Sequence, residues 1–118
     1  MLVKTNKRSL RFEGSAADGD WLVLTAAENQ ILIFSLASGL EKGQFFGTAP
    51  FVAGSAGLMA LEYDERDLDL YDLDSQQLRR RYIFSDPIIL KYLSYDGKRL
   101  LVVTASQTAY LLDTTAVN

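Results

Sequence analysis

One unit is written three times along the chain, and this repeat limits the possible folds more than any other feature. The segment WLVLT at 21–25 aligns with LMALE at 58–62 and with LLVVT at 100–104. A second apolar segment follows at 33–36, 70–73 and 111–114. The offsets are 37 and 42 residues for the first segment and 37 and 41 for the second. Because periods of this size are typical of stacked repeats, we expect a repeat architecture.

Each unit is predicted to contain four short strands. The apolar residues come in runs or alternate, and no window keeps a helical period, which favours an all-β fold. Asp-Gly pairs at 18–19 and 96–97 and the segment 55–57 predict tight turns before the second strand. The expected first strands are Ser9–Phe12, Phe51–Gly54 and Ile88–Tyr92, and the expected fourth strands are Gly43–Gly47 and Leu78–Ser85. The best helical candidate, Asp74–Arg81, is short and flanked by strand-like sequence.

Two motifs resemble those of WD-repeat β-propellers. The segment SYDGKRL at 94–100 is similar to that family's Ser-Pro-Asp-Gly turn, and LYDL at 70–73 is similar to its Trp-Asp dipeptide. Asp72 and Asp113 keep the aspartate of the dipeptide, whereas Ser35 replaces it. A chain without histidine lacks the family's Gly-His dipeptide and its Asp-His-Ser/Thr-Trp network. The resemblance implies one all-β domain over 1–118, with four-stranded antiparallel blade-like units at about 1–40, 41–76 and 77–118.

The strand count predicts an incomplete propeller. Propellers need about 4–8 blades to close. The last unit ends on its third strand, at Tyr110, Leu111, Leu112 and Asp113, while Leu2, Val3, Lys4 and Thr5 form a spare strand before the first unit. We therefore expect these two segments to pair between two copies, so that a homodimer closes a six-bladed ring. The competing hypothesis is that the chain is a fragment of a larger propeller or a subunit of a larger assembly.

Composition excludes several kinds of site. The chain has no cysteine, so it has no disulfide and no thiolate nucleophile, and the lack of histidine removes the commonest general base and metal ligand. A net charge of -3 gives no general attraction to nucleic acid. No apolar run is long enough for a signal peptide or membrane helix. We expect a cytoplasmic, noncatalytic protein without cofactor or metal, and with no nucleic-acid or membrane partner.

The best candidate partner-binding face lies at the turn between the second and third strands of the middle unit. The segment 62–74 holds seven acidic residues and one arginine, without the spacing of a calcium loop. A solvated acidic hairpin is the simpler interpretation, and a site for a metal ion or a cationic partner is the alternative. In propellers this turn shares a ring face with the connections between blades. The predicted partner face consists of Tyr63, Asp64, Glu65, Arg66, Asp67 and Asp86.

Other residues have a structural and a functional interpretation. Arg79–Arg81 could bind phosphate, but a solvated bend or pairing with the acidic hairpin is the simpler expectation. Trp21 is expected in the core rather than in a sugar-binding site. Lys4, Lys7, Arg8 and Arg11 are expected to protect a strand edge.

Three function classes follow. The first is a protein-interaction scaffold that presents its loops to a protein partner. The second is an oligomeric small-ligand or carbohydrate-binding propeller, and the third is a propeller hydrolase or lactonase with clustered acidic metal ligands.

Overall fold

The computed structural model describes residues 12–115, and the predictions for Leu2–Thr5, Lys7, Arg8 and Arg11 lie outside them. The described part of the chain is all-β, with two short 3-10 helices, η1 (Ala27–Asn29) and η2 (Gly54–Ala56). The strands are β1 (Phe12–Asp18), β2 (Trp21–Ala26), β3 (Gln30–Ser35), β4 (Glu41–Phe46), β5 (Thr48–Ala53), β6 (Leu58–Glu62), β7 (Asp67–Asp72), β8 (Leu78–Ile83), β9 (Ile88–Leu93), β10 (Arg99–Thr104) and β11 (Ala109–Asp113).

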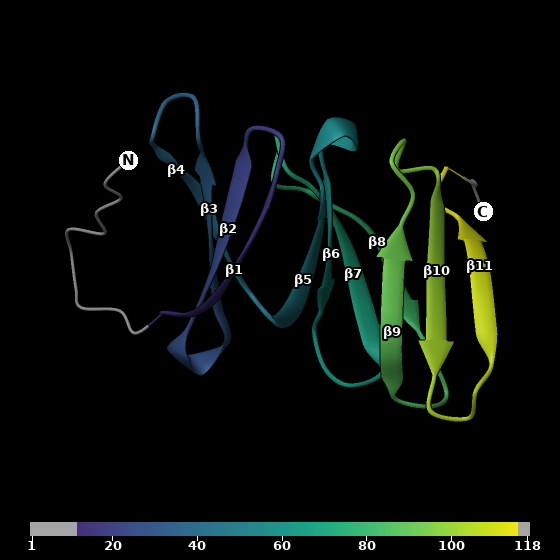
Figure 1. Ribbon diagram of the computed structural model, residues 1–118. Helices are drawn as coiled ribbons and strands as arrows, with labels where there is room; N and C mark the ends of the chain where they lie inside the picture. The colour runs from purple at the N-terminus through teal and green to yellow at the C-terminus, as the bar shows by residue number, and fades with distance from the viewer. Residues whose placement is uncertain (1–11, 116–118) are drawn as a thin grey trace.

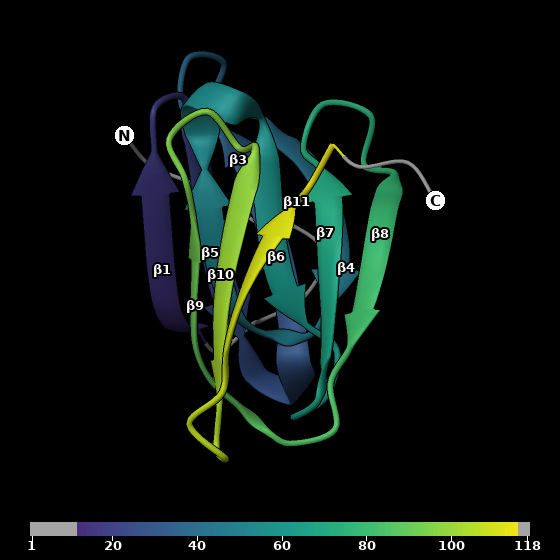
Figure 2. The ribbon, with the colours of Figure 1, turned by 90° about the vertical axis from the view of Figure 1, so that its right-hand side faces the viewer.

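The strands form three antiparallel sheets that stand side by side (Figure 1). Blade 1 contains β1–β4, blade 2 contains β5–β8, and blade 3 contains only β9–β11. Within each blade the strands pair in chain order, and β5 contacts both β1 and β9. Figure 2 looks along the row of blades from the side of blade 3. The arrangement is an open arc of a β-propeller, as the repeat predicts.

The register of the strands corrects the alignment of the third repeat. Trp21 pairs with Ser35, Leu58 pairs with Asp72, and Arg99 pairs with Asp113. Arg99, not Leu100, is therefore the equivalent of Trp21 and Leu58. Both offsets between the second and third copies become 41 residues, and the third hairpin is not shorter. Because side chains alternate along a strand, this shift of one residue exchanges the two faces of β10.

Two apolar cores fill the spaces between the blades. We call the face of a blade toward the next blade its front face and the opposite one its back face. The front face of blade 1 and the back face of blade 2 form one core, with Trp21, Val23, Ile31, Ile33, Phe45, Met59, Leu61 and Leu73. The front face of blade 2 and the back face of blade 3 form the other, with Ala53, Leu58, Ala60, Leu68, Leu70, Phe84, Leu93, Leu100 and Val102.

The front face of blade 3 has no blade against it among residues 12–115. The three repeat-equivalent residues Ile33, Leu70 and Leu111 show the difference, because their exposed fractions are 1%, 0% and 71%. Leu90 and Tyr92 on β9 are also more than half exposed. An apolar position that is buried in two blades is therefore open to solvent in the third.

The first strand is predicted at Ser9–Phe12, of which the residues 9–11 lie outside the described part of the chain. The structure extends this strand beyond the predicted end, because β1 continues from Phe12 to Asp18. The sequence FEGSAAD looks unlike a strand because it is rich in small residues. β1 nevertheless pairs along its length with the apolar β2, so the neighbouring strand imposes the conformation. The helical candidate Asp74–Arg81 overlaps β8, so its second half is strand.

Candidate functional site

The first candidate site is the free edge of blade 3. Among residues 12–115 no strand pairs with the outer edge of β11, whereas β4 and β8 cover the equivalent strands β3 and β7. In β11, Tyr110 and Leu112 face blade 2, and Tyr110 packs on Phe84 with ring centroids 5.1 Å apart. Leu111 faces the open side. The predicted edge residues Tyr110–Asp113 thus form an open strand edge with one apolar position exposed.

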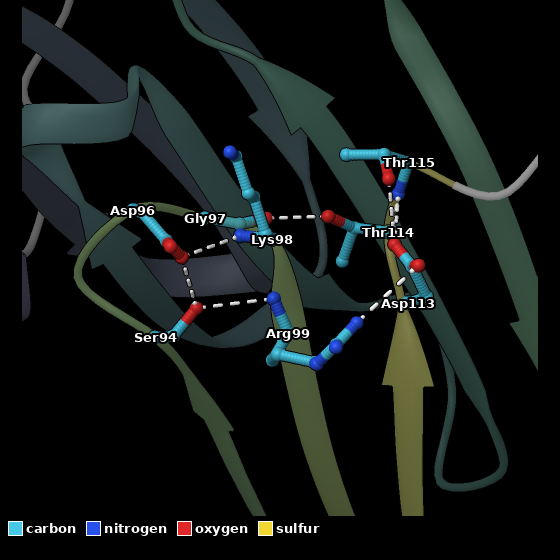
Figure 3. A network of polar contacts seen from close by, with 8 residues as sticks. All are labelled: Ser94, Asp96, Gly97, Lys98, Arg99, Asp113, Thr114 and Thr115. Atoms are coloured by element: carbon cyan, nitrogen blue, oxygen red, sulfur yellow. Dashed lines mark hydrogen bonds and ion pairs between the residues drawn. The ribbon is translucent and has the colours of Figure 1, made fainter.

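A polar network fixes the turn at one end of this edge (Figure 3). The Asp96 Oδ1 atom accepts hydrogen bonds from the Ser94 hydroxyl at 2.7 Å and from the Lys98 backbone N–H at 2.9 Å. The Ser94 hydroxyl oxygen in turn accepts from the Arg99 N–H at 3.0 Å. The Lys98 N–H bond, followed by the Ser94 bond, lowers the pKa of Asp96. The Asp-Gly turn predicted from the sequence is therefore braced by side-chain hydrogen bonds.

The same network reaches the end of β11. The Thr114 hydroxyl donates to the Gly97 carbonyl, and Arg99 lies 3.3 Å from the Asp113 carboxylate. Asp113 also accepts hydrogen bonds from the hydroxyl and backbone N–H of Thr115, at 2.7 and 2.9 Å. These Thr115 bonds, with a smaller contribution from Arg99, lower the pKa of Asp113. The side chains of Arg99 and Asp113 remain about half exposed, so this end of the open edge is charged.

The second candidate site is the predicted partner face. The turn at 63–67 and the connection at 84–88 lie together, because Phe84 N–H donates to the Arg66 carbonyl at 3.0 Å and Ile88 N–H to the Glu65 carbonyl at 2.7 Å. The Asp64 carboxylate accepts from the backbone N–H groups of Arg66 and Asp67 at 2.8 and 3.0 Å. Asp86 and Asp67 are half-buried, while Glu65 and Arg66 are exposed. Backbone hydrogen bonds thus hold the turn at 63–67 beside the connection that carries Asp86.

An exposed aromatic ring is held on this surface. Tyr63 is 58% exposed, and the Arg81 guanidinium lies 4.7 Å from the centre of its ring. Arg81 is itself bound by both oxygens of Asp69, at 2.6 and 2.9 Å, and this carboxylate is buried. The bidentate bond to Asp69 raises the pKa of Arg81, so the guanidinium stays charged. A buried aspartate thus orients the arginine on which Tyr63 rests.

The expectation of a fully solvated acidic hairpin is wrong for Asp69. Its side chain is 1% exposed and points into the contact between blades 1 and 2. The expected pairing of the arginine cluster with the acidic hairpin is confirmed for Arg81. Burial, followed by the charge of Asp69, raises the pKa of the neighbouring Tyr71 hydroxyl. Arg79 is exposed on β8.

A second ion pair, which the sequence analysis missed, joins blades 2 and 3. The Lys91 Nζ atom lies 2.6 Å from Glu62 Oε2, and the two side chains are only 8% and 16% exposed. They lie 29 positions apart, so no local pattern connects them. The pair fixes the first strand of blade 3 against the residue before the Tyr63 turn.

Three further observations concern Trp21, membrane-spanning helices and metal-binding groups. Trp21 is 9% exposed in the core between blades 1 and 2, which confirms its structural role. No helix in the described part of the chain is long and apolar enough to cross a membrane. Within residues 12–115 no group of three or more acidic side chains is placed to hold a metal ion.

Comparisons with known proteins show the fold. No family model and no curated protein sequence matches the chain. Among solved structures, the chain is similar to the β-propeller domain of Cps50 (Swd1) from Myceliophteria thermophila, with a TM-score of 0.66, 14% identity and coverage of 92% of this chain and 38% of that one. The WD40 domain of Toxoplasma gondii coronin matches with a TM-score of 0.64, 13% identity and coverage of 80% and 28%.

A third solved structure also matches the chain. BamB from Moraxella catarrhalis gives a TM-score of 0.66 at 10% identity, with 84% of this chain and 30% of that chain covered. The chain therefore spans well under half the length of each of these propellers.

Proposed function

We propose that the chain is a noncatalytic protein-interaction scaffold, a half-propeller that a second copy completes to a six-bladed ring. The ring presents the Tyr63 turn to a protein partner. The observation that carries the proposal is the open third blade, in which Leu111 is 71% exposed at a position buried in blades 1 and 2. An open strand edge beside an exposed apolar face is a typical site of association.

The chain length before β1 supports a second copy as the occupant of the edge. Six residues, 6–11, separate the predicted strand Leu2–Thr5 from Phe12. At about 3.3 Å per residue they can span roughly 20 Å. Four residues, 84–87, make the equivalent crossing from β8 to β9. The segment before β1 is thus long enough to bring a fourth strand to blade 3 of a neighbouring copy.

The energetics favour two junctions. A ring of two copies has two identical junctions, each burying on the order of 1,000 Å². At about 25 cal/mol per Å² of apolar area, they can exceed an association cost of about 4–15 kcal/mol. Leu32 and Phe34 on the back face of blade 1 are already buried. The gain therefore comes chiefly from the front face of blade 3.

The assembly is tested by multi-angle light scattering on the purified chain between about 1 and 100 μM. A mass of twice 13.1 kDa is expected. A monomer with a cooperative melting transition at the highest concentration would contradict the ring.

The presentation of the Tyr63 turn is tested separately. The double substitution Glu65→Lys/Arg66→Glu keeps the net charge and inverts the charge pattern of exposed side chains, while Asp64 continues to brace the turn. We expect a specific protein partner, captured and identified with the native chain, to be lost with this variant while the dimer is retained. Equal capture by both would place the partner surface elsewhere.

A further inference from the structure

The turns before the second strands touch from blade to blade. The Asp18 Oδ2 atom of blade 1 accepts a hydrogen bond from the Gly54 N–H of blade 2 at 2.6 Å. The Ser55 hydroxyl of blade 2 donates to the Tyr95 carbonyl of blade 3 at 2.7 Å. We call these two bonds the rim contacts. They join equivalent positions at successive steps around the arc, although Asp18 accepts from a backbone N–H and Ser55 donates to a backbone carbonyl.

Counting back from the second strands, which begin at Trp21, Leu58 and Arg99, shows the equivalence. Asp18 and Ser55 each lie three positions before the second strand of their own blade. Their partners Gly54 and Tyr95 each lie four positions before the second strand of the next blade. In both contacts, the residue three positions before the second strand of one blade thus meets the residue four positions before the second strand of the next blade.

The rim contacts are close enough to fix the blades relative to each other. A Cβ atom added to Gly54 would lie 2.1 Å from the Asp18 carbonyl oxygen. A Cβ added to Gly97 would lie 2.6 Å from the Ala56 Cβ atom. The turns therefore meet with little room between backbones, and their spacing is a geometric property of the blade step.

We propose that the series continues between copies, with Asp96 of one copy lying against Ala17 of a second. This inference rests on the proposed ring and adds the register of the junction, that is, which residues of the two copies meet. Asp96 stands three positions before Arg99 and is exposed in the described part of the chain. Ala17 stands four positions before Trp21, is exposed, and pairs with Leu22 on the back face of blade 1.

The charges beside the two positions are complementary. Lys98 and Arg99 flank Asp96, and both are exposed. Asp18 and Asp20 follow Ala17 in the second copy. Their carboxylates accept hydrogen bonds within their own chain, from Gly54, Ser35 and Ala37, so the two turns are complementary in overall charge rather than through direct ion pairs. A symmetric contact of blade 3 with blade 3 would instead place Lys98 and Arg99 of one copy against the same two residues of the other copy. Since like charges at an interface disfavour association, the head-to-tail arrangement is the better fit.

The absence of native cysteine makes a cross-linking test clean. Full-length Ala17→Cys and Asp96→Cys chains carry different tags. They are mixed so that subunits exchange and mixed dimers form, and the mixture is then treated with a short bismaleimide. We expect a cross-linked pair of the two tags in the mixture and none in either chain alone. The intrachain pair Ser55→Cys/Tyr95→Cys is the positive control, and Ala17→Cys with Glu65→Cys, at the opposite end of the strands, is the negative control. Lys98→Cys, which keeps the Asp96 side chain, replaces Asp96→Cys if that variant does not fold.

The outcomes separate the register from the ring. A dimer by light scattering that gives no mixed cross-link overturns the register and leaves the ring standing. A cross-link within Asp96→Cys alone overturns the head-to-tail arrangement. A monomer overturns both.

Discussion

Replacing Leu111 by alanine is the most direct measurement of what the open blade contributes. Leu111 is 71% exposed in the single chain, so its truncation removes little packing from the fold. Burying a leucine side chain completely stabilises by about 1.5–3 kcal/mol. Burial of the exposed part of Leu111 is then worth about 1–2 kcal/mol at each junction, or about 2–4 kcal/mol for a ring with two junctions.

At 1.4 kcal/mol per factor of ten, Leu111→Ala should weaken the dimer by roughly 30- to 700-fold. Sedimentation equilibrium over a range of concentrations gives the dissociation constant, and thermal unfolding of the diluted monomer gives its stability. Ile83→Ala is the matched control, because Ile83 is 74% exposed but lies on the outer strand of blade 2. The control should leave the dissociation constant within about twofold.

Two results would refute the reasoning. If Leu111→Ala and Ile83→Ala change the dissociation constant equally, the front face of blade 3 is not the junction. If Leu111→Ala leaves a dimer of unchanged affinity, the exposed leucine has no assembly role.

Three further predictions concern charged residues. Lys98→Glu should raise the dissociation constant of the dimer about tenfold, and by less at 1 M salt. Arg79→Glu makes the same charge change on blade 2 and should leave the dissociation constant unchanged. Equal dissociation constants for the two variants would contradict the proposed junction. Lys91→Met should destabilise the folded monomer by about 3 kcal/mol in urea unfolding because it leaves Glu62 buried without its partner, and adding Glu62→Gln should restore part of the loss. Because the pKa of Asp113 is lowered in the folded chain, its carboxylate should stabilise the fold above the ordinary pKa of 3.8, and this effect should be lost as the pH falls through the lowered value. Asp113→Asn should therefore flatten the pH dependence of the free energy of urea unfolding between about pH 2 and 5. An unchanged pH dependence would show that the lowered pKa is not linked to folding.

The repeat in the sequence was sufficient to predict the propeller fold and the missing fourth strand. It misplaced the third copy by one residue, because LLVVT matches WLVLT better than RLLVV does. Hydrogen bonding settles the register: the N–H groups of Leu36, Leu73 and Thr114 donate to the carbonyls of Asp20, Gly57 and Lys98, each just before a second strand. Arg99 occupies the position of Trp21 and Leu58. Because arginine is unlike tryptophan and leucine, a comparison of residue types does not reveal this equivalence.

The candidate sites show the same division between local and distant information. The Tyr63 turn could be predicted because its polar residues are contiguous between two apolar strands. The support beneath its ring could not, since Asp69 and Arg81 meet across a strand pair and Lys91 meets Glu62 across two blades. Buried ion pairs of this kind depend on which faces the blades turn to each other.

The braced turn at 63–67 has a consequence for how strongly a partner could be held. A ring of two copies related by a twofold axis along its channel would carry two such turns on one side. A partner with a single matching segment would gain nothing from the second turn. One with two segments joined by a linker of suitable length would bind the second as an intramolecular step, and the gain in avidity could reach about 10²–10⁴. Loss of the dimer would then weaken capture of a bivalent partner without any change at Tyr63 itself.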